Sequence, residues 1–258
     1  MGIKHHALVT TLALTILCGS IAAHAKSCVE NQECMFQTIA NEAAKIDNQS
    51  WRDQTYRELA KSMAAAGLVQ EAIPYIEKIQ TPDTKAMTIR GIGMAAAQLG
   101  LSPEQYAALF TTLRAEAEKI THPPSYAIAL TYIAMSQAFA GDNAGAWKTA
   151  SDMENDALRH KAYGETAEIQ AGKGNTQAAM KSIGLIESEA YRNKSYSIVC
   201  KILTDNAKQD LDYQKAFDFA DAITNPYKKA EAMQYIVIAR QTQAAEAHKS
   251  LKENGITN

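Results

Sequence analysis

The sequence predicts an all-helical protein built as an αα-solenoid of about five to six helix-turn-helix repeats. Three observations support this prediction. Apolar residues that can close a helix recur roughly every 33 residues, helix-starting residues follow each of them at a fixed distance, and glycine or alanine recurs where a turn between two helices is expected.

The apolar residue that closes each repeat is called the anchor. The spacings between successive anchors are 33, 41, 33, 33 and 37 residues. The longer two exceed 33 by eight and four residues, which is close to two turns and one turn of helix because a turn takes about 3.6 residues. We therefore expect inserted whole turns that lengthen a helix and keep its buried face in register. The anchors are Ile46, Ile79, Ile120, Met153, Ile186 and Ile223.

A new helix is expected to begin just after each anchor. Five of the six residues two positions after the anchors are standard N-cap types. Proline or an acid often follows, as the missing donor of proline and the helix dipole favour. The expected N-caps are Asn48, Thr81, His122, Asn155, Ser188 and Asn225.

Two further positions recur inside each repeat. Small residues stand fourteen positions after most anchors, where two helices could approach closely: Ala60, Gly93, Ala134, Ala167 and Cys200, with Val237 in the last repeat. Glycine or alanine stands twenty-one positions after each anchor, where a helix should end: Gly67, Gly100, Gly141, Gly174, Ala207 and Ala244. We therefore expect helix, tight turn and helix in each unit, and no strand between Ser50 and Gln241.

This pattern resembles the tetratricopeptide-repeat family, although the period is 33 residues instead of the 34 of that family. The resemblance covers residues 40 to 245, and it implies a superhelical array with a concave, ligand-binding surface. The matching core and turn positions are Tyr56, Leu59, Ala60, Met63, Gly67, Ala72, Ile76 and Ile79, then Leu130, Ile133, Ala134, Gly141 and Ala146, then Tyr163, Ala167, Gly174 and Ala179.

The N-terminus predicts export. A basic residue, Lys4, precedes an uncharged apolar stretch over residues 7–17, and residues 23–25 supply a small-x-small cleavage pattern. We expect a cleaved signal peptide over residues 1–25, a single helical repeat domain over 26–258, and a periplasmic or secreted protein. The alternative is a lipoprotein signal acylated at Cys18, although Leu17 stands where such sites need a small side chain.

The charge balance excludes some partners. Signal removal takes away one of the 26 basic residues and none of the 28 acidic ones, which leaves a net charge of −3 without a charge block. This balance argues against nucleic acid and against tight binding to an anionic membrane. No segment after the signal approaches transmembrane length.

Three cysteines remain after cleavage, and they allow three pairings. Cys28 and Cys34 are closest in sequence, but six residues of helix rise about 9 Å, so the two cannot both lie in a regular helix if they are joined. Their pairing would fit a turn that leads into a helix capped by Asn31, and would make residues 26–38 a disulfide-stapled lead-in. Two free thiols are the alternative. Cys200 is expected to be a buried apolar filler.

No catalytic, cofactor-binding or metal site is predicted. Gly91 and Gly93 match the spacing of a dinucleotide-binding fingerprint. That fingerprint needs a preceding strand and binds phosphate at the N-terminus of a helix, whereas the repeat places these glycines inside a helix. His122 and His160 fall at a cap and near a helix start, where solvated roles are expected, and acids such as Glu116 and Asp152 read as solvated helix faces.

A basic residue stands six positions after most anchors. Because a cation early in a helix opposes the helix dipole, something must compensate it. Pairing with local acids is one interpretation, and an anion-binding track is the other. The residues are Arg52, Lys85, Arg159, Arg192 and Lys229, with Tyr126 in the third repeat.

The family resemblance implies that the first helix of each repeat lines the concave surface. That surface would be apolar and rich in methionine at its centre, and methionine adapts to ligands of varied shape. The alternative is that these residues belong to the core. The predicted groove residues are Arg57, Lys61, Met87, Arg90, Met94, Ile128, Met135 and Phe139.

The function predicted from the sequence is that of a non-enzymatic interaction module which binds a peptide or protein segment in this groove. A binder of a small molecule, a lipid or another amphipathic ligand is the alternative. An enzyme assembled across repeats is the third hypothesis, which a buried acid–base pair facing a pocket would support.

Overall fold

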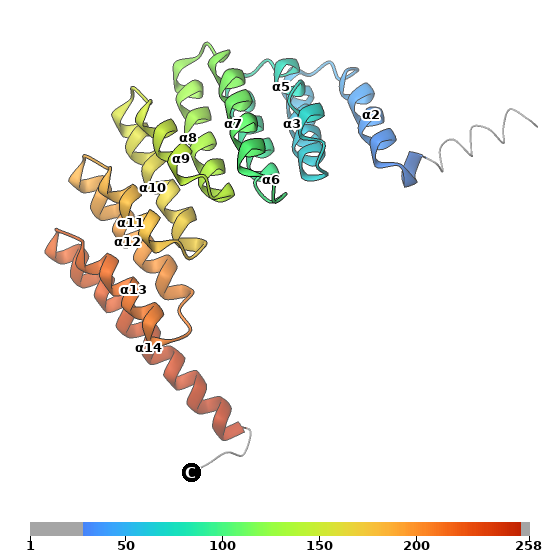
Figure 1. Ribbon diagram of the computed structural model, residues 1–258. Coiled ribbons are helices and arrows are strands. Elements are labelled where there is room, and N and C mark those ends of the chain that lie inside the picture. Colours follow the sequence, from blue (N-terminus) through green and yellow to red (C-terminus); the bar gives the residue numbers. More distant parts are fainter. Residues whose placement is uncertain (1–27, 254–258) are drawn as a thin grey trace, which may run out of the picture.

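The computed structural model describes residues 28–253, and this part of the chain is all-helical, without a strand (Figure 1). The predicted signal peptide, residues 1–25, lies outside the described residues. The thirteen helices are α2 (Gln32–Ala43), α3 (Gln49–Ala65), α4 (Val69–Ala72), α5 (Tyr75–Lys78), α6 (Pro82–Ala96), α7 (Pro103–Glu118), α8 (Pro123–Ala140), α9 (Asn143–Ser151), α10 (Asp156–Gly172), α11 (Thr176–Gly184), α12 (Glu189–Asp205), α13 (Asp210–Asp221) and α14 (Pro226–Glu253).

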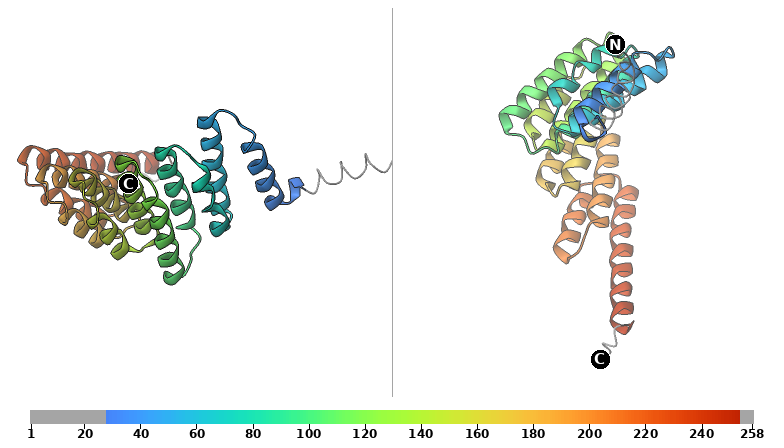
Figure 2. Two further views of the ribbon diagram at one scale, coloured as in Figure 1. Left: turned by 90° about the horizontal axis from the view of Figure 1, so that it is seen from above. Right: turned by 90° about the vertical axis from the view of Figure 1, so that its right-hand side faces the viewer.

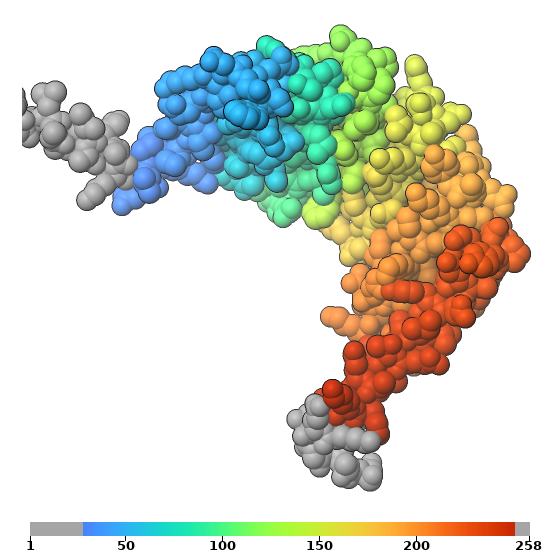
Figure 3. All heavy atoms as spheres, turned by 180° about the vertical axis from the view of Figure 1, so that it is seen from behind, coloured from blue at the N-terminus to red at the C-terminus, as the bar shows by residue number. Residues whose placement is uncertain are grey.

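The helices follow one another along a curved arc (Figures 1 and 2). The helices that begin after each anchor, called the first helices, are α3, α6, α8, α10, α12 and α14, and each packs against the next. The second helices, α4 with α5, α7, α9, α11 and α13, each pack against the first helices on either side. In the described chain no two second helices approach each other as closely, so the first helices line the inner side of the curve, whose hollow is visible in Figure 3.

The expected helix starts are confirmed. Each of the six predicted N-cap residues directly precedes a helix, and the side chains of Asn48, Asn155 and Asn225 each accept a hydrogen bond of 3.0 Å from the backbone N–H three residues on. The side chain of His122 makes no capping hydrogen bond to the backbone, and its Nδ1 lies 2.7 Å from the hydroxyl of Ser125.

The longer spacings lengthen second helices, as predicted. The helix α7 has 16 residues and α13 has 12, whereas α9 and α11 have nine each. The second helix of the first repeat is instead broken into α4 and α5. Pro74 lies at the break. Proline interrupts a helix because it has no N–H to donate and its ring collides with the preceding turn.

The four glycine turns are confirmed. Gly67, Gly100, Gly141 and Gly174 have φ values of 88°, 66°, 90° and 80°. Only glycine adopts this left-handed conformation without a steric penalty, so each glycine ends one helix and lets the chain reverse.

The first helices meet at the recurring small residues. Ala60, Ala134 and Ala167 are fully buried and Cys200 is 1% exposed. At Gly93 the contact with α8 is closest, because a Cβ there would lie 2.6 Å from Oγ and 2.9 Å from Cβ of Ser136. The small residues therefore set the distance between neighbouring first helices.

The sulfur chemistry follows the predicted pairing. Cys28 and Cys34 form a disulfide with an S–S distance of 2.09 Å, and Asn31 between them caps α2 by accepting hydrogen bonds from the N–H groups of Glu33 and Cys34. Cys200 is a buried free thiol, and burial raises its pKa to about 11.

Among residues 28–253, no helix has the length and apolar character needed to cross a membrane.

Replacing Gly93 by alanine should destabilise the protein by about 1–3 kcal/mol, because the new methyl group overpacks the contact with Ser136. Gly172 is the matched control. It is also helical, but a Cβ there would meet no atom within 4 Å, so Gly172→Ala should stabilise by about 0.5–1 kcal/mol through helix propensity. Urea unfolding of both variants measures the difference, and equal effects would contradict the close approach of α6 and α8.

Thiol titration of the folded, unreduced protein at neutral pH should find no reactive thiol. Cys28 and Cys34 are joined, and a buried thiol whose pKa is about 11 carries almost no reactive thiolate at neutral pH. Denaturation without reductant should release one thiol, that of Cys200. Two or more thiols at that step would refute the disulfide.

Candidate binding groove

A groove of about 680 Å³ lies between the first helices α3 and α6. Five of the eight predicted groove residues line it: Arg57, Lys61, Met87, Arg90 and Met94. The other lining residues are Glu58, Ala65, Gly91, Ala95, Gln98 and Leu99.

Helical spacing brings these side chains to one surface. Met87, Arg90 and Met94 stand at positions i, i+3 and i+7 of α6, which share one face of a helix, and all three are half-buried. Ile89 and Ile92, on the other face of α6, are fully buried in the core. The methionines of the groove are therefore surface residues of the array, not part of its core.

The groove is shallow because its helices are close together. A Cβ on Gly91 would lie 3.3 Å from Cβ of Lys61, so Gly91 lets α6 approach α3 at the floor of the groove. The stem of Lys61 packs across this glycine, while its ammonium group stays exposed.

The lining carries an excess of positive charge. Arg57, Lys61 and Arg90 face a single acid, Glu58, which lies 2.8 Å from the guanidinium of Arg57 and 3.9 Å from Nζ of Lys61. The guanidinium of Arg90 instead lies 5.1 Å from the ring centroid of Tyr132 on α8. The groove thus combines apolar thioether surface with two net positive charges, which suits a segment that presents both apolar and acidic groups.

The other three predicted groove residues lie on α8, outside this groove. Ile128, Met135 and Phe139 are half-buried. Ile128 packs against the main core, and the ammonium group of Lys173 lies 4.4 Å from the ring centroid of Phe139. These residues continue the first-helix surface, but they are not part of the lining of the groove between α3 and α6.

Sequence reasoning missed several lining residues. Glu58 follows Arg57 directly and precedes Lys61 by almost one turn, so its helical position could have placed it on the same face. Gln98 and Leu99 lie just beyond the end of α6, where periodicity gives no signal. Tyr132 does not line the groove, and its contact with Arg90 could not be predicted because it depends on the neighbouring helix.

The recurring cations act mainly on backbone carbonyl groups. Arg52, Arg159 and Arg192 each donate a hydrogen bond to the carbonyl of their own anchor, at 3.0, 2.9 and 2.7 Å. Each cation therefore neutralises the negative end of the preceding helix. Arg159 also lies 3.3 Å from Glu187, and Lys229 lies 3.1 Å from Asp221. Local compensation therefore accounts for Arg52, Arg159, Arg192 and Lys229.

One histidine lies where the sequence interpretation did not expect it. His160 is buried and not solvated, because its ring packs against Tyr191 at a centroid distance of 5.4 Å. Its Nε2 has no hydrogen-bond partner and lies 4.0 Å from a carboxylate oxygen of Glu187. It does not line the groove between α3 and α6.

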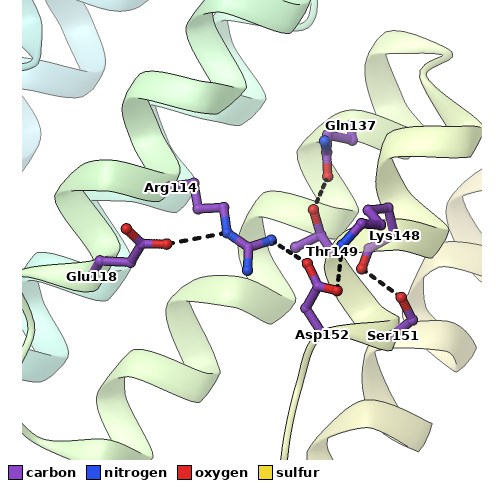
Figure 4. Close-up of polar contacts among 7 residues, drawn as sticks. All are labelled: Arg114, Glu118, Gln137, Lys148, Thr149, Ser151 and Asp152. Carbon is purple, nitrogen blue, oxygen red and sulfur yellow. Dashed lines mark hydrogen bonds and ion pairs between the residues drawn. The ribbon is translucent and has the colours of Figure 1, made fainter.

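Glu116 and Asp152 are less solvated than expected, with side chains that are 11% and 25% exposed. Figure 4 shows Arg114 of α7 between Glu118 and Asp152, with Arg114 donating to Asp152 at 2.8 Å and Lys148 lying 2.5 Å from the same carboxylate. These hydrogen bonds, that of Lys148 first, lower the pKa of Asp152. The carboxylate of Asp152 therefore stays ionised and joins α7 to the end of α9, so its role is structural.

Within the described residues, no three His, Cys, Asp or Glu side chains gather in a way that could hold a metal ion.

Comparison with known proteins finds no match to this chain among protein-family models, curated proteins or solved structures.

Replacing Arg192 by methionine should destabilise the protein by about 1–3 kcal/mol, because the carbonyl groups of Ile186 and Glu187 lose a charged donor. Lys194→Met, an exposed cation two residues on, is the control and should change stability by less than about 0.5 kcal/mol. Thermal unfolding compares the two. An unchanged Arg192→Met variant would show that the carbonyl contact contributes nothing.

Proposed function

We propose that this chain is a non-enzymatic, exported binding protein, and that its groove between α3 and α6 holds a peptide or protein segment. The proposed architecture is a tetratricopeptide-like αα-solenoid. The observation that carries the proposal is that Arg57, Lys61, Met87, Arg90 and Met94 line one open groove.

The solenoid assignment is supported by equivalences between repeats. Residues that share a distance from their anchors share a role: the glycines that end helices, the small residues between first helices, and the arginines that bind anchor carbonyls. An array of this kind exposes a continuous surface of first helices, which is suited to an extended ligand.

The lining supports binding and not chemistry. Pockets that hold ligands combine apolar walls with a few placed polar groups, as this groove does. Its lining includes no histidine, cysteine or serine, and its single acid, Glu58, is held by Arg57. An acid–base pair facing the groove, which would have favoured an enzyme, is not part of this lining.

Export is supported by the disulfide. A bond between Cys28 and Cys34 persists in oxidising compartments and is rare in the cytosol. It lies directly after the predicted signal peptide, so the periplasm or the extracellular space fits both features.

Selection of phage-displayed random peptides on the purified, processed protein tests this function. The expected binders carry apolar side chains together with acidic ones. Met87→Ser combined with Met94→Ser should weaken binding of a selected peptide by about 2–4 kcal/mol, since central apolar anchors dominate binding energies. Stability should fall less than the roughly 2–5 kcal/mol lost when a core side chain is emptied. The matched control is Met35→Ser, another partly exposed methionine, on α2.

Two results would contradict the proposal. The first is selected peptides that bind the double variant as tightly as the unaltered protein. The second is a double variant that unfolds much more easily yet binds normally while folded, which would assign the methionines to the core. Competition by a long-chain fatty acid in the same assay would favour the lipid-binding alternative.

A further inference from the structure

Every interior first helix has two packed faces. The near face contacts the preceding first helix and the far face contacts the following one. Ring contacts between neighbouring first helices define both faces, by the distance of each residue from its anchor. His160 stands at position 7 on a far face and meets Tyr191, which stands at position 5 of the next first helix. Arg90 at position 11 meets Tyr132, and Lys201 at position 15 meets Tyr235. Both tyrosines stand at position 12 of the next first helix. These residues meet in three ring contacts, at 5.4, 5.1 and 4.3 Å.

The far face of the last first helix is uncovered in the described chain. Position 14 is buried in all five preceding repeats, yet its equivalent on α14, Val237, is 52% exposed. Ile238, at position 15, is 57% exposed, and Ala230, Gln234 and Gln241 are exposed beside them. This face therefore carries residues at the positions that contact a following first helix elsewhere, but no such helix follows α14 in the described chain.

The near face of α3, the earliest of the first helices, has no preceding first helix in the described chain, although α2 packs against part of α3. Position 5 of α3 is Trp51, which is 67% exposed, and position 12 is the exposed Glu58. An apolar groove of about 540 Å³ runs along this face between α3 and α2, lined by Phe36, Ile39, Trp51, Gln54, Thr55, Glu58, Leu59 and Ser62. It lies where the interior pattern would place a preceding first helix.

We propose that a second copy of this chain fills this groove, so that α14 of one copy packs beside α3 of the next and continues the array from end to end. The two uncovered faces are the two halves of one contact that already forms at every interior junction. The partner is therefore another copy of the chain, joined head to tail.

The interior pairings predict which residues would meet. By analogy with the contact between positions 7 and 5, Ala230 of one copy would lie under the indole ring of Trp51 of the next copy. Position 11 against position 12 places the amide of Gln234 by Glu58, where it can donate a hydrogen bond to the carboxylate. Val237 and Ile238 would be buried against the groove, and burial of such side chains is the main driving force of association. A head-to-tail contact does not use the same surface twice, so it produces open chains or rings.

Two blocked variants and one control test the contact. The far-face variant carries Val237→Glu and Ile238→Lys, and the near-face variant carries Ile39→Glu and Trp51→Ala. All four side chains are exposed, so both variants should keep the helical circular dichroism and thermal unfolding of the unaltered protein. The control is Leu185→Glu, an exposed leucine at the end of α11.

Sedimentation equilibrium of the exported, processed protein over a range of concentrations is the measurement. The unaltered protein and the control should form species larger than a monomer, and each blocked variant alone should be monomeric. Mixing the two variants should restore association but stop at one copy of each, because the intact α14 of one can use only the intact α3 of the other.

Three results would overturn the inference. One is an unaltered protein that stays monomeric up to its solubility limit. Another is a near-face variant that still dimerises, which would indicate a two-fold contact between two α14 helices. The third is a mixture of the variants that remains monomeric while the unaltered protein associates. None of these results depends on whether the groove between α3 and α6 binds a peptide.

Discussion

The structure depends on the close approach of successive first helices at one small residue per repeat. Ala60, Gly93, Ala134, Ala167 and Cys200 carry little or no side-chain bulk between the helices. Within the described residues, the second helices are in little or no contact with one another, so they stand further apart. An array that is tight on one side and loose on the other must curve toward the tight side. The same constraint that packs the core therefore creates the concave surface.

Most of the fold could be predicted because its signals are local and repeated. An N-cap residue, an apolar anchor and a helix-ending glycine each act within a few residues, and recurrence at a fixed period separates them from chance. The exceptions depend on single residues or on neighbours. Pro74 breaks the second helix of one repeat only, and His160 is buried because Tyr191 of the next repeat packs on its ring. No pattern within one repeat contains that information.

The candidate groove could be predicted only in part, for a related reason. Helical spacing assigns residues to a face, and that sufficed for Met87, Arg90 and Met94. Whether two faces enclose a groove depends on the separation of the helices, which Gly91 sets at α3 and α6. On α8 the ring of Tyr132 reaches back to Arg90 and occupies the equivalent space. Met94 lines the groove between α3 and α6, whereas Met135 and Phe139 do not, a difference that sequence periodicity does not express.

Glu58 connects the groove to the end of the array. It lines the groove between α3 and α6 and also the groove between α2 and α3. The equivalent residues Gly91, Tyr132 and Tyr235 lie against the preceding first helix, so a copy seated on α3 would draw Glu58 into that contact. Arg57 and Lys61 would then lose part of the negative charge that now compensates them, and the groove would attract acidic groups more strongly. By thermodynamic linkage, an acidic ligand in the groove would favour the end-to-end contact to the same degree. A single shared carboxylate would therefore couple the proposed ligand binding to the proposed assembly.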